Sequence, residues 1–283
     1  MLAKRENSAL TFSNRVDELE KAMLQLQQVS CPVIHRFGPG IYIREVAIPA
    51  DTFAVGHYQN FEHLNVMLKG CVTVLNEDGS TSELKAPLIF VGKPGRKIGY
   101  IKEDMVWLNI YQTDETDVEK LEAALITKSD GWLQDAKQKK AIANFKGEVD
   151  KQDYLQLLNE FGFTEEQAKE QAHNETDLIE LPYGGFKIKV ADSSIQGRGL
   201  FATADIAEGE LIAPARINGF RTIAGRFTNH SVSHNAKMVR MNEGDIALVA
   251  TRNIQGCKGG EDGEEITINY REALQLTLQI GKE

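Results

Sequence analysis

The stretch RFTNHSVSHN, residues 226–235, places two histidines, two asparagines, two serines and an arginine in ten positions with only two apolar residues. His230 and His234 have the i, i+4 spacing that directs two imidazoles at one metal ion when the segment is helical. Weak helix formers around them, and the absence of a glutamate beside His230, count against a metal site. Ser231 lacks the glycine-flanked turn of a hydrolase nucleophile. A self-bonded structural turn is a further alternative.

Two other segments, one before and one after this stretch, favour a different interpretation. They are SSIQGRGLFATADIAEGELI at 193–212 and ALVATRNIQGCKGGEDGEEITINY at 247–270. The three segments share turns and strands whose order resembles the SET domain of protein-lysine methyltransferases. The motifs that carry the resemblance are Gly197-Arg198-Gly199, Arg226-Phe227-Thr228-Asn229-His230-Ser231 and Glu265-Ile266-Thr267-Ile268-Asn269-Tyr270. The resemblance covers about residues 180–275, within a SET-like domain that we delimit at 178–283.

This resemblance implies a cofactor, a cofactor site and a catalytic residue. The cofactor is S-adenosyl-L-methionine, and Tyr270 takes the place of the catalytic tyrosine at the end of the terminal strand. A knot-like crossing of the two C-terminal motifs is implied as well. The residues that correspond to the cofactor site are Gly197, Arg198, Gly199, Arg226, Phe227, Asn229 and His230.

The residue types suit methyl transfer. Gly197 and Gly199 allow a backbone to approach a ligand closely, and an asparagine such as Asn229 has both a donor and acceptors for an amino-acid tail. Lysine is mostly protonated in water, so a partly apolar channel is needed to favour the neutral amine that attacks the methyl group. We expect the Tyr270 hydroxyl to orient that amine.

The chain also departs from the family pattern. Val232 stands where a cysteine normally follows the serine, Asn269 replaces the aspartate before the final tyrosine, and Ala215 stands where many relatives have a tyrosine. About 15 residues separate Glu210 from Arg226, so the insert that helps to grip a substrate peptide is almost absent.

Residues 31–113 have a different sequence pattern. Short runs such as IYIREVAI, HLNVMLKGCVTVL, PLIFV and MVWLNIY alternate with turns, which predicts a β-sandwich or small barrel. The stretch GHYQNFEHLNVMLKG, residues 56–70, resembles the first signature of the cupins, with His57, Gln59 and His63 at the metal-ligand places. The second signature has its Pro94-Gly95 turn but no following histidine. We therefore expect a cupin-like domain without a metal, and His57, Gln59 and His63 are the donors if one is retained.

The remaining segments are predicted to be helical. Residues 1–30 contain an amphipathic helix at 14–28 behind the caps Ser13 and Asn14, and residues 114–177 form an acidic helical connector. In the connector, Thr164 and Gln167 have the spacing of a capping box. The predicted fold class is mainly β with α: a cupin-like domain, a connector and a SET-like domain.

Charge is concentrated in the connector. Residues 114–177 have 8 basic and 16 acidic side chains, a balance of -8 out of the net -9. That distribution argues against nucleic acid as a partner and favours a basic protein or peptide. No stretch is apolar enough for a membrane helix, and the three cysteines are too far apart in sequence for a CxxC site, so we expect a cytoplasmic protein with reduced thiols. A homo-oligomer is an open alternative.

Three functions follow from these patterns. The first is a compact S-adenosylmethionine-dependent lysine methyltransferase acting on a basic target. Trimmed SET domains of this kind occur in viruses and bacteria, and the cupin-like half resembles small phage-encoded proteins, which suggests a phage origin. The second is a non-catalytic assembly or binding protein, such as a virion component, built on cupin and SET scaffolds. The third is a metalloenzyme that uses His57, Gln59 and His63.

Overall fold

A computed structural model describes residues 2–280 of the chain, which divide into two compact units. Unit 1 comprises residues 1–139 with 257–261, and unit 2 comprises residues 140–256 with 262–283. The segment 114–177, expected as a separate acidic connector, is therefore shared between both units. Its first helix, α2 (Val118–Leu125), belongs to unit 1, and its last two helices belong to unit 2.

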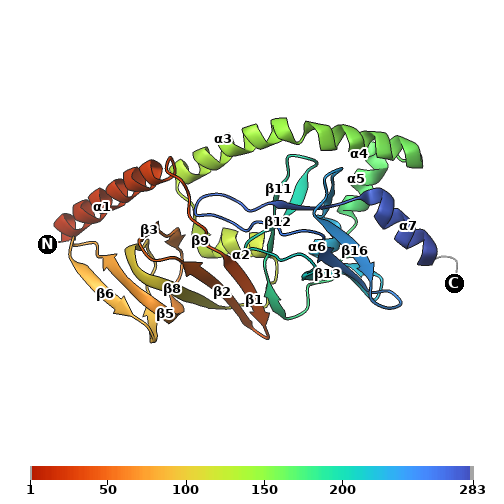
Figure 1. The fold of residues 1–283 in the computed structure, drawn as a ribbon. Helices are drawn as coiled ribbons and strands as arrows, with labels where there is room; N and C mark the ends of the chain where they lie inside the picture. The colour runs from red at the N-terminus through yellow and green to blue at the C-terminus, as the bar shows by residue number, and fades with distance from the viewer. Residues whose placement is uncertain (1, 281–283) are drawn as a thin grey trace. The chain divides into compact units, whose positions relative to one another are not determined.

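Unit 1 is built on an antiparallel sheet. Its strands lie in the order β1 (Val33–Gly38), β2 (Ile41–Ile48), β8 (Ile98–Gln112), β5 (His63–Leu75) and β6 (Thr81–Lys85), as Figure 1 shows. In addition, β3 (Thr52–Val55) pairs with β8 and β7 (Leu88–Gly92) with β5. The strands predicted at 41–48 and 63–75 form with these bounds, and the NEDG turn has Gly79 at φ 84°.

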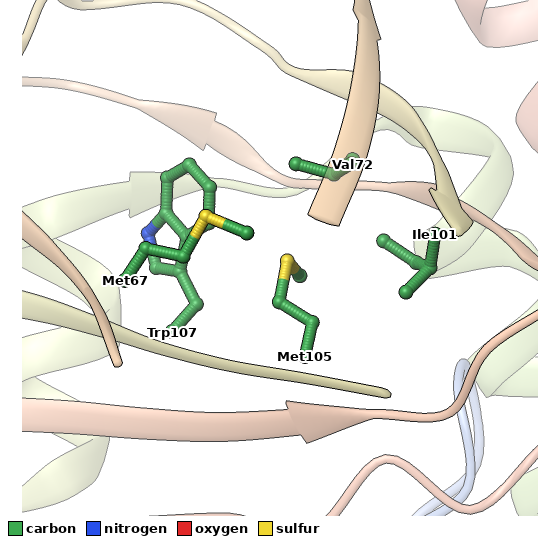
Figure 2. Packing of buried hydrophobic residues seen from close by; sticks show 5 residues of the cluster. All are labelled: Met67, Val72, Ile101, Met105 and Trp107. Atoms are coloured by element: carbon green, nitrogen blue, oxygen red, sulfur yellow. The ribbon is translucent and has the colours of Figure 1, made fainter. Parts of the chain in front are cut away.

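The described strands of unit 1 do not close into a barrel. The long strands β5 and β8 change register between Met67 and Val72, where the pairing contains bulges. Gly70 lies there with a φ of 96°, and a Cβ at this position would come within 2.6 Å of the Asp104 carbonyl oxygen. The bend encloses a core of Met67, Val72, Ile101, Met105 and Trp107 (Figure 2). Of the two predicted alternatives, the closed barrel does not form.

The N-terminal helix differs from its prediction. Helix α1 spans Leu2–Met23, so Ser13 and Asn14 lie inside it and do not cap it, and it ends five residues earlier than expected. Val16 and Glu20 are buried. The Glu20 carboxylate binds Arg96 at 2.5 Å and also accepts a hydrogen bond from Ser129. Short strands β4 (Tyr58–Gln59) and β9 (Ile126–Thr127) pair with each other.

Helix α3 (Asp130–Lys146) crosses the boundary between the units, and α4 (Glu148–Phe161) and α5 (Glu165–His173) follow in unit 2. The capping box is confirmed: the Thr164 side chain accepts from the Gln167 backbone, and the Gln167 side chain accepts from the Thr164 backbone. Helix α4 buries Tyr154, Leu157 and Leu158, so the segment packs into unit 2 along one helix face.

Unit 2 contains two small four-stranded sheets. The first has the order β11 (Ile188–Asp192), β12 (Arg198–Ala202), β18 (Glu265–Ile268) and β15 (Asn229–His230). The second has the order β14 (Phe220–Arg221), β13 (Leu211–Ile217), β17 (Ile246–Ala250) and β16 (Ala236–Arg240). The other elements of the unit are β10 (Gly184–Phe186), α6 (Ile223–Arg226) and α7 (Tyr270–Ile280).

The end of the chain corrects one expectation. Strand β18 ends at Ile268, and Tyr270 is the first residue of α7 and not the last residue of a strand. Strand β15 lies parallel to β18, with Asn229 opposite Thr267 and His230 opposite Ile268. The second and third motifs therefore run side by side. The coarse fold class, mainly β with helices, is confirmed.

Among residues 2–280, no helix combines the length and the apolar character needed to cross a membrane.

Candidate functional site

Asn229 joins the three motifs of unit 2. Its side-chain amide nitrogen donates to the backbone carbonyls of Gln196 (3.1 Å), just before the first motif, and of Arg198 (3.0 Å), within that motif. The same nitrogen lies 2.9 Å from Glu265 Oε1 in the third motif. Three acceptors thus share two amide protons, and segments up to 69 residues apart, from 196 to 265, meet at one buried side chain.

Glu265 is the acidic partner within this cluster. Ser193 Oγ donates to both carboxylate oxygens, at 2.7 and 2.9 Å. Burial raises the pKa of Glu265, and the hydrogen bonds from Asn229 and Ser193 act in the opposite direction. A Cβ on Gly199 would lie 2.2 Å from Glu265 Oε1. Gly199 is needed because this carboxylate, and not a ligand, approaches its backbone.

His230 links the motif to helix α4. Its Nδ1 accepts from the backbone N–H of Tyr270 at 3.1 Å, and its Nε2 lies 2.6 Å from Asp153 Oδ2. Because Nδ1 is an acceptor, we assign the ring proton to Nε2, which donates to the carboxylate. Arg271 binds the same carboxylate at 2.9 Å. Hydrogen bonds from Arg271 and His230 hold the pKa of Asp153 below its ordinary value.

A second carboxylate of α4 holds the turn that follows. Asp150 Oδ1 accepts from Ser231 Oγ at 2.9 Å and from the Val232 backbone N–H at 3.0 Å. Sequence reasoning missed Asp150 and Asp153. Their i, i+3 spacing puts them on one helix face, but nothing in the sequence pairs that face with residues 80 positions away.

Tyr270 lies against the second motif. Its hydroxyl donates to the Thr228 carbonyl oxygen at 3.0 Å. Its ring packs edge-on against Tyr154, with centroids 6.2 Å apart, and lies 5.4 Å from the His230 ring. Burial raises the pKa of Tyr270 above its ordinary value, so the phenol is neutral and acts through hydrogen bonds.

The other residues of the predicted cofactor site have contacts of their own. Gly197 has a φ of 50°, and a Cβ built there meets no atom within 4 Å. Arg198 Nε is 3.6 Å from Asp192. The Arg226 guanidinium lies 5.6 Å from the Phe227 ring centroid, and its Nε is buried without a hydrogen-bond partner among the described residues. Arg226 as a whole is half-buried, and its unused Nε donor is suited to an anionic group.

Each of the three candidate metal donors of unit 1 contacts other side chains of the chain, and Gln59 and His63 both contact Tyr111. His57 packs edge-on against Trp132, and burial lowers its pKa to about 3. Gln59 Oε1 accepts from the Tyr111 hydroxyl at 2.5 Å. His63 Nε2 lies 3.1 Å from Asn109 Nδ2. Across residues 2–280, no three His, Cys, Asp or Glu side chains are grouped so that they could hold a metal ion.

Unit 1 instead has a buried network of neutral polar side chains. Asn65 Oδ1 accepts from Trp107 Nε1 at 2.9 Å and from Asn109 Nδ2 at 2.8 Å. His35 Nδ1 lies 2.7 Å from the Tyr42 hydroxyl. These groups come from strands β1, β2, β5 and β8, which pair directly, so the network follows from strand register.

Comparison with known proteins gives limited similarity. No protein-family model and no curated protein matches the chain. Among solved structures, it is similar to a cupin-2 domain protein of Shewanella frigidimarina, with 16% identity over 33% of this chain and 90% of that one, and a TM-score of 0.25. A cupin domain of Bordetella pertussis has 14% identity over 31% of this chain and 98% of that one, with a TM-score of 0.26.

Proposed function

We propose that residues 178–283 are a SET-like domain that binds S-adenosyl-L-methionine and methylates a lysine in a basic protein. The observation that carries this proposal is the convergence of the three motifs at Asn229, which bonds to Gln196, Arg198 and Glu265. The knot-like crossing is part of the proposal, supported by the parallel pairing of β15 with β18. A cupin-like N-terminal domain and a cytoplasmic setting complete it.

Two residues fit the amino-acid tail of the cofactor. The buried Arg226 Nε is an unused donor among the described residues and suits a carboxylate. The hydrogen bonds of the Asn229 side chain use its amide nitrogen, so its amide oxygen is the atom to accept from the ammonium group. Open space beside Gly197 leaves room for the tail at the first motif. When bound, the cofactor supplies an electrophilic methyl group.

Tyr270 would position the lysine amine. Its hydroxyl proton is directed at the Thr228 carbonyl, so the hydroxyl oxygen is left to accept an N–H of the amine. That hydrogen bond turns the nitrogen lone pair away from Tyr270 and toward the methyl group. Because the pKa of Tyr270 is raised, the tyrosine orients the amine and does not deprotonate it. The amine must therefore lose its proton as it is desolvated.

The acidic surface that would attract a basic target is on α5. Glu165, Glu166 and Glu170 are exposed. In α4, by contrast, Asp153 is bound by Arg271 and His230, and Asp150 by Ser231. Asp150 and Asp153 of α4 therefore hold the fold together, and the exposed carboxylates of α5 are available to a partner.

The test compares Tyr270→Phe with Tyr183→Phe, which changes an exposed tyrosine of the same unit. Each variant is given labelled S-adenosylmethionine and a set of lysine-rich peptides. We expect Tyr270→Phe to reduce methyl incorporation at least about 100-fold, the loss of one positioning group in the transition state. Tyr183→Phe should keep the wild-type rate. Full turnover by Tyr270→Phe would remove this residue from the mechanism.

A second candidate function is a non-catalytic assembly or binding protein. The observation that favours it is that the chain's own groups satisfy most of the 226–235 stretch. His230 is bound to Asp153, Ser231 to Asp150, and Asn235 to the backbone of Glu265 and Thr267. These hydrogen bonds stabilise the turn without any ligand. This candidate predicts that the protein does not bind S-adenosylhomocysteine.

A further inference from the structure

The sheet of unit 1 exposes apolar side chains on the face away from its core. On β5, the side chains of His63, Asn65 and Met67 are buried, while the alternate residues Leu64 and Leu68 are exposed. Successive residues of a strand point to opposite faces, so these leucines belong to the face away from the core. A sheet with one solvated face ordinarily has polar residues there.

The outward residues of neighbouring strands continue this face. One row runs across four strands, from Ile43 on β2 through Ile110 on β8 and Leu64 on β5 to Val91 on β7. We call the surface that this row and its neighbours form the outer apolar face.

A second row lies next to the first. It runs from Leu108 on β8 through Val66 on β5 to Ile89 on β7. Directly paired residues on one face have Cβ atoms about 5 Å apart, so the two rows form a continuous patch and not scattered apolar side chains.

The patch is strongly exposed. The exposed fraction is 67% for Ile89, 63% for Val91, 56% for Leu68 and 46% for Ile41. The seven residues of the two rows, together with Leu68 and Ile41, each cover about 4.8 Å by 6.8 Å of the sheet, which gives a projected area of roughly 300 Å². That is within the range of about 300–600 Å² for the largest patch of a typical monomer, which is often functional.

We infer that the outer apolar face binds the same face of a second copy of this chain. The charged outward residues at its β1–β2 edge, Arg36 and Glu45, bind each other at 2.8 Å, so they offer little to select a partner of different chemistry. A face of this kind is complementary to itself, and a two-fold axis pairs it with its copy as two packed sheets. Because the chain has a net charge of -9, two copies repel over much of their surface and approach most readily at an uncharged face.

The experiment measures the mass of the full chain by sedimentation equilibrium between about 1 and 100 μM, a range that spans ordinary dimer affinities. Ile89→Glu and Leu68→Glu each put a carboxylate on the face at a mostly exposed position, so the monomer should fold. Phe53→Glu is the matched control, because Phe53 is 63% exposed and lies on β3, outside the outer apolar face.

We expect the wild-type protein to be a dimer. Each glutamate variant should weaken the dimer at least about 100-fold, since the dimer would bury two unpaired carboxylates, and Phe53→Glu should leave it within about twofold. The milder Ile89→Ala should weaken it about 10-fold through lost apolar contact. A wild-type monomer at 100 μM, or a dimer that Ile89→Glu and Leu68→Glu leave unchanged, would overturn the inference.

Discussion

Each unit contains a cluster of polar side chains that bond to one another, and the two clusters differ in charge. In unit 1 the cluster is neutral: Asn65, Trp107 and Asn109 bond to one another across two paired strands. In unit 2 the cluster is ionised, and Asp153 is bound by His230 and Arg271. The neutral network depends on strand register within one sheet. The charged network depends on the packing of helix α4 against His230 and Ser231, which are about 80 residues away in the sequence.

The largest expected effect tests the charged cluster. Asp153→Ala removes the acceptor of the His230 Nε2–H and one partner of Arg271, and it leaves a buried imidazole unsatisfied. We expect a loss of about 3 kcal/mol in the free energy of unfolding, because the buried His230 Nε2–H loses its charged acceptor. Urea denaturation measures it. The control is Glu160→Ala, which removes an exposed partner of Arg271 and should cost less than about 1 kcal/mol. Equal effects would mean that His230 does not depend on Asp153.

A smaller effect is expected in the neutral cluster. Asn65→Ala leaves Trp107 Nε1–H and an Asn109 proton without their acceptor, which should cost about 2 kcal/mol. Gln112→Ala, at the exposed end of β8, is the control and should change stability by less than about 0.5 kcal/mol. If Asn65→Ala is as stable as this control, the neutral network contributes little to folding.

The sequence predicted elements well where the pattern is local. Strands 41–48 and 63–75 and the capping box of Thr164 with Gln167 formed as expected, because side-chain alternation and cap chemistry are set by neighbouring residues. The predicted start of the first helix was wrong, because the helix begins at Leu2. Residues before Ser13 lack a clear apolar period, and so the two polar residues were interpreted as a cap.

The candidate site was predictable in part. The motif order placed Asn229, Glu265 and Tyr270 in one region, and the structure brings them together. The motif order did not reveal that Asp150 binds Ser231 and that Asp153 binds His230, because such contacts are fixed by the tertiary packing of α4. Nor did it show that Tyr270 begins a helix: the short apolar run 266–268 has strand character, and α7 starts two residues after it.

The central claim is that the cluster around Asn229 and Tyr270 forms a site for an S-adenosyl cofactor. Calorimetric titration of the full chain with S-adenosylhomocysteine tests it most directly. We expect one saturable site per chain with a Kd of roughly 10 μM, weakened at least about 10-fold by Asn229→Ala and unchanged by Tyr270→Phe. The absence of saturable binding in folded wild-type protein at about 1 mM ligand would contradict the account.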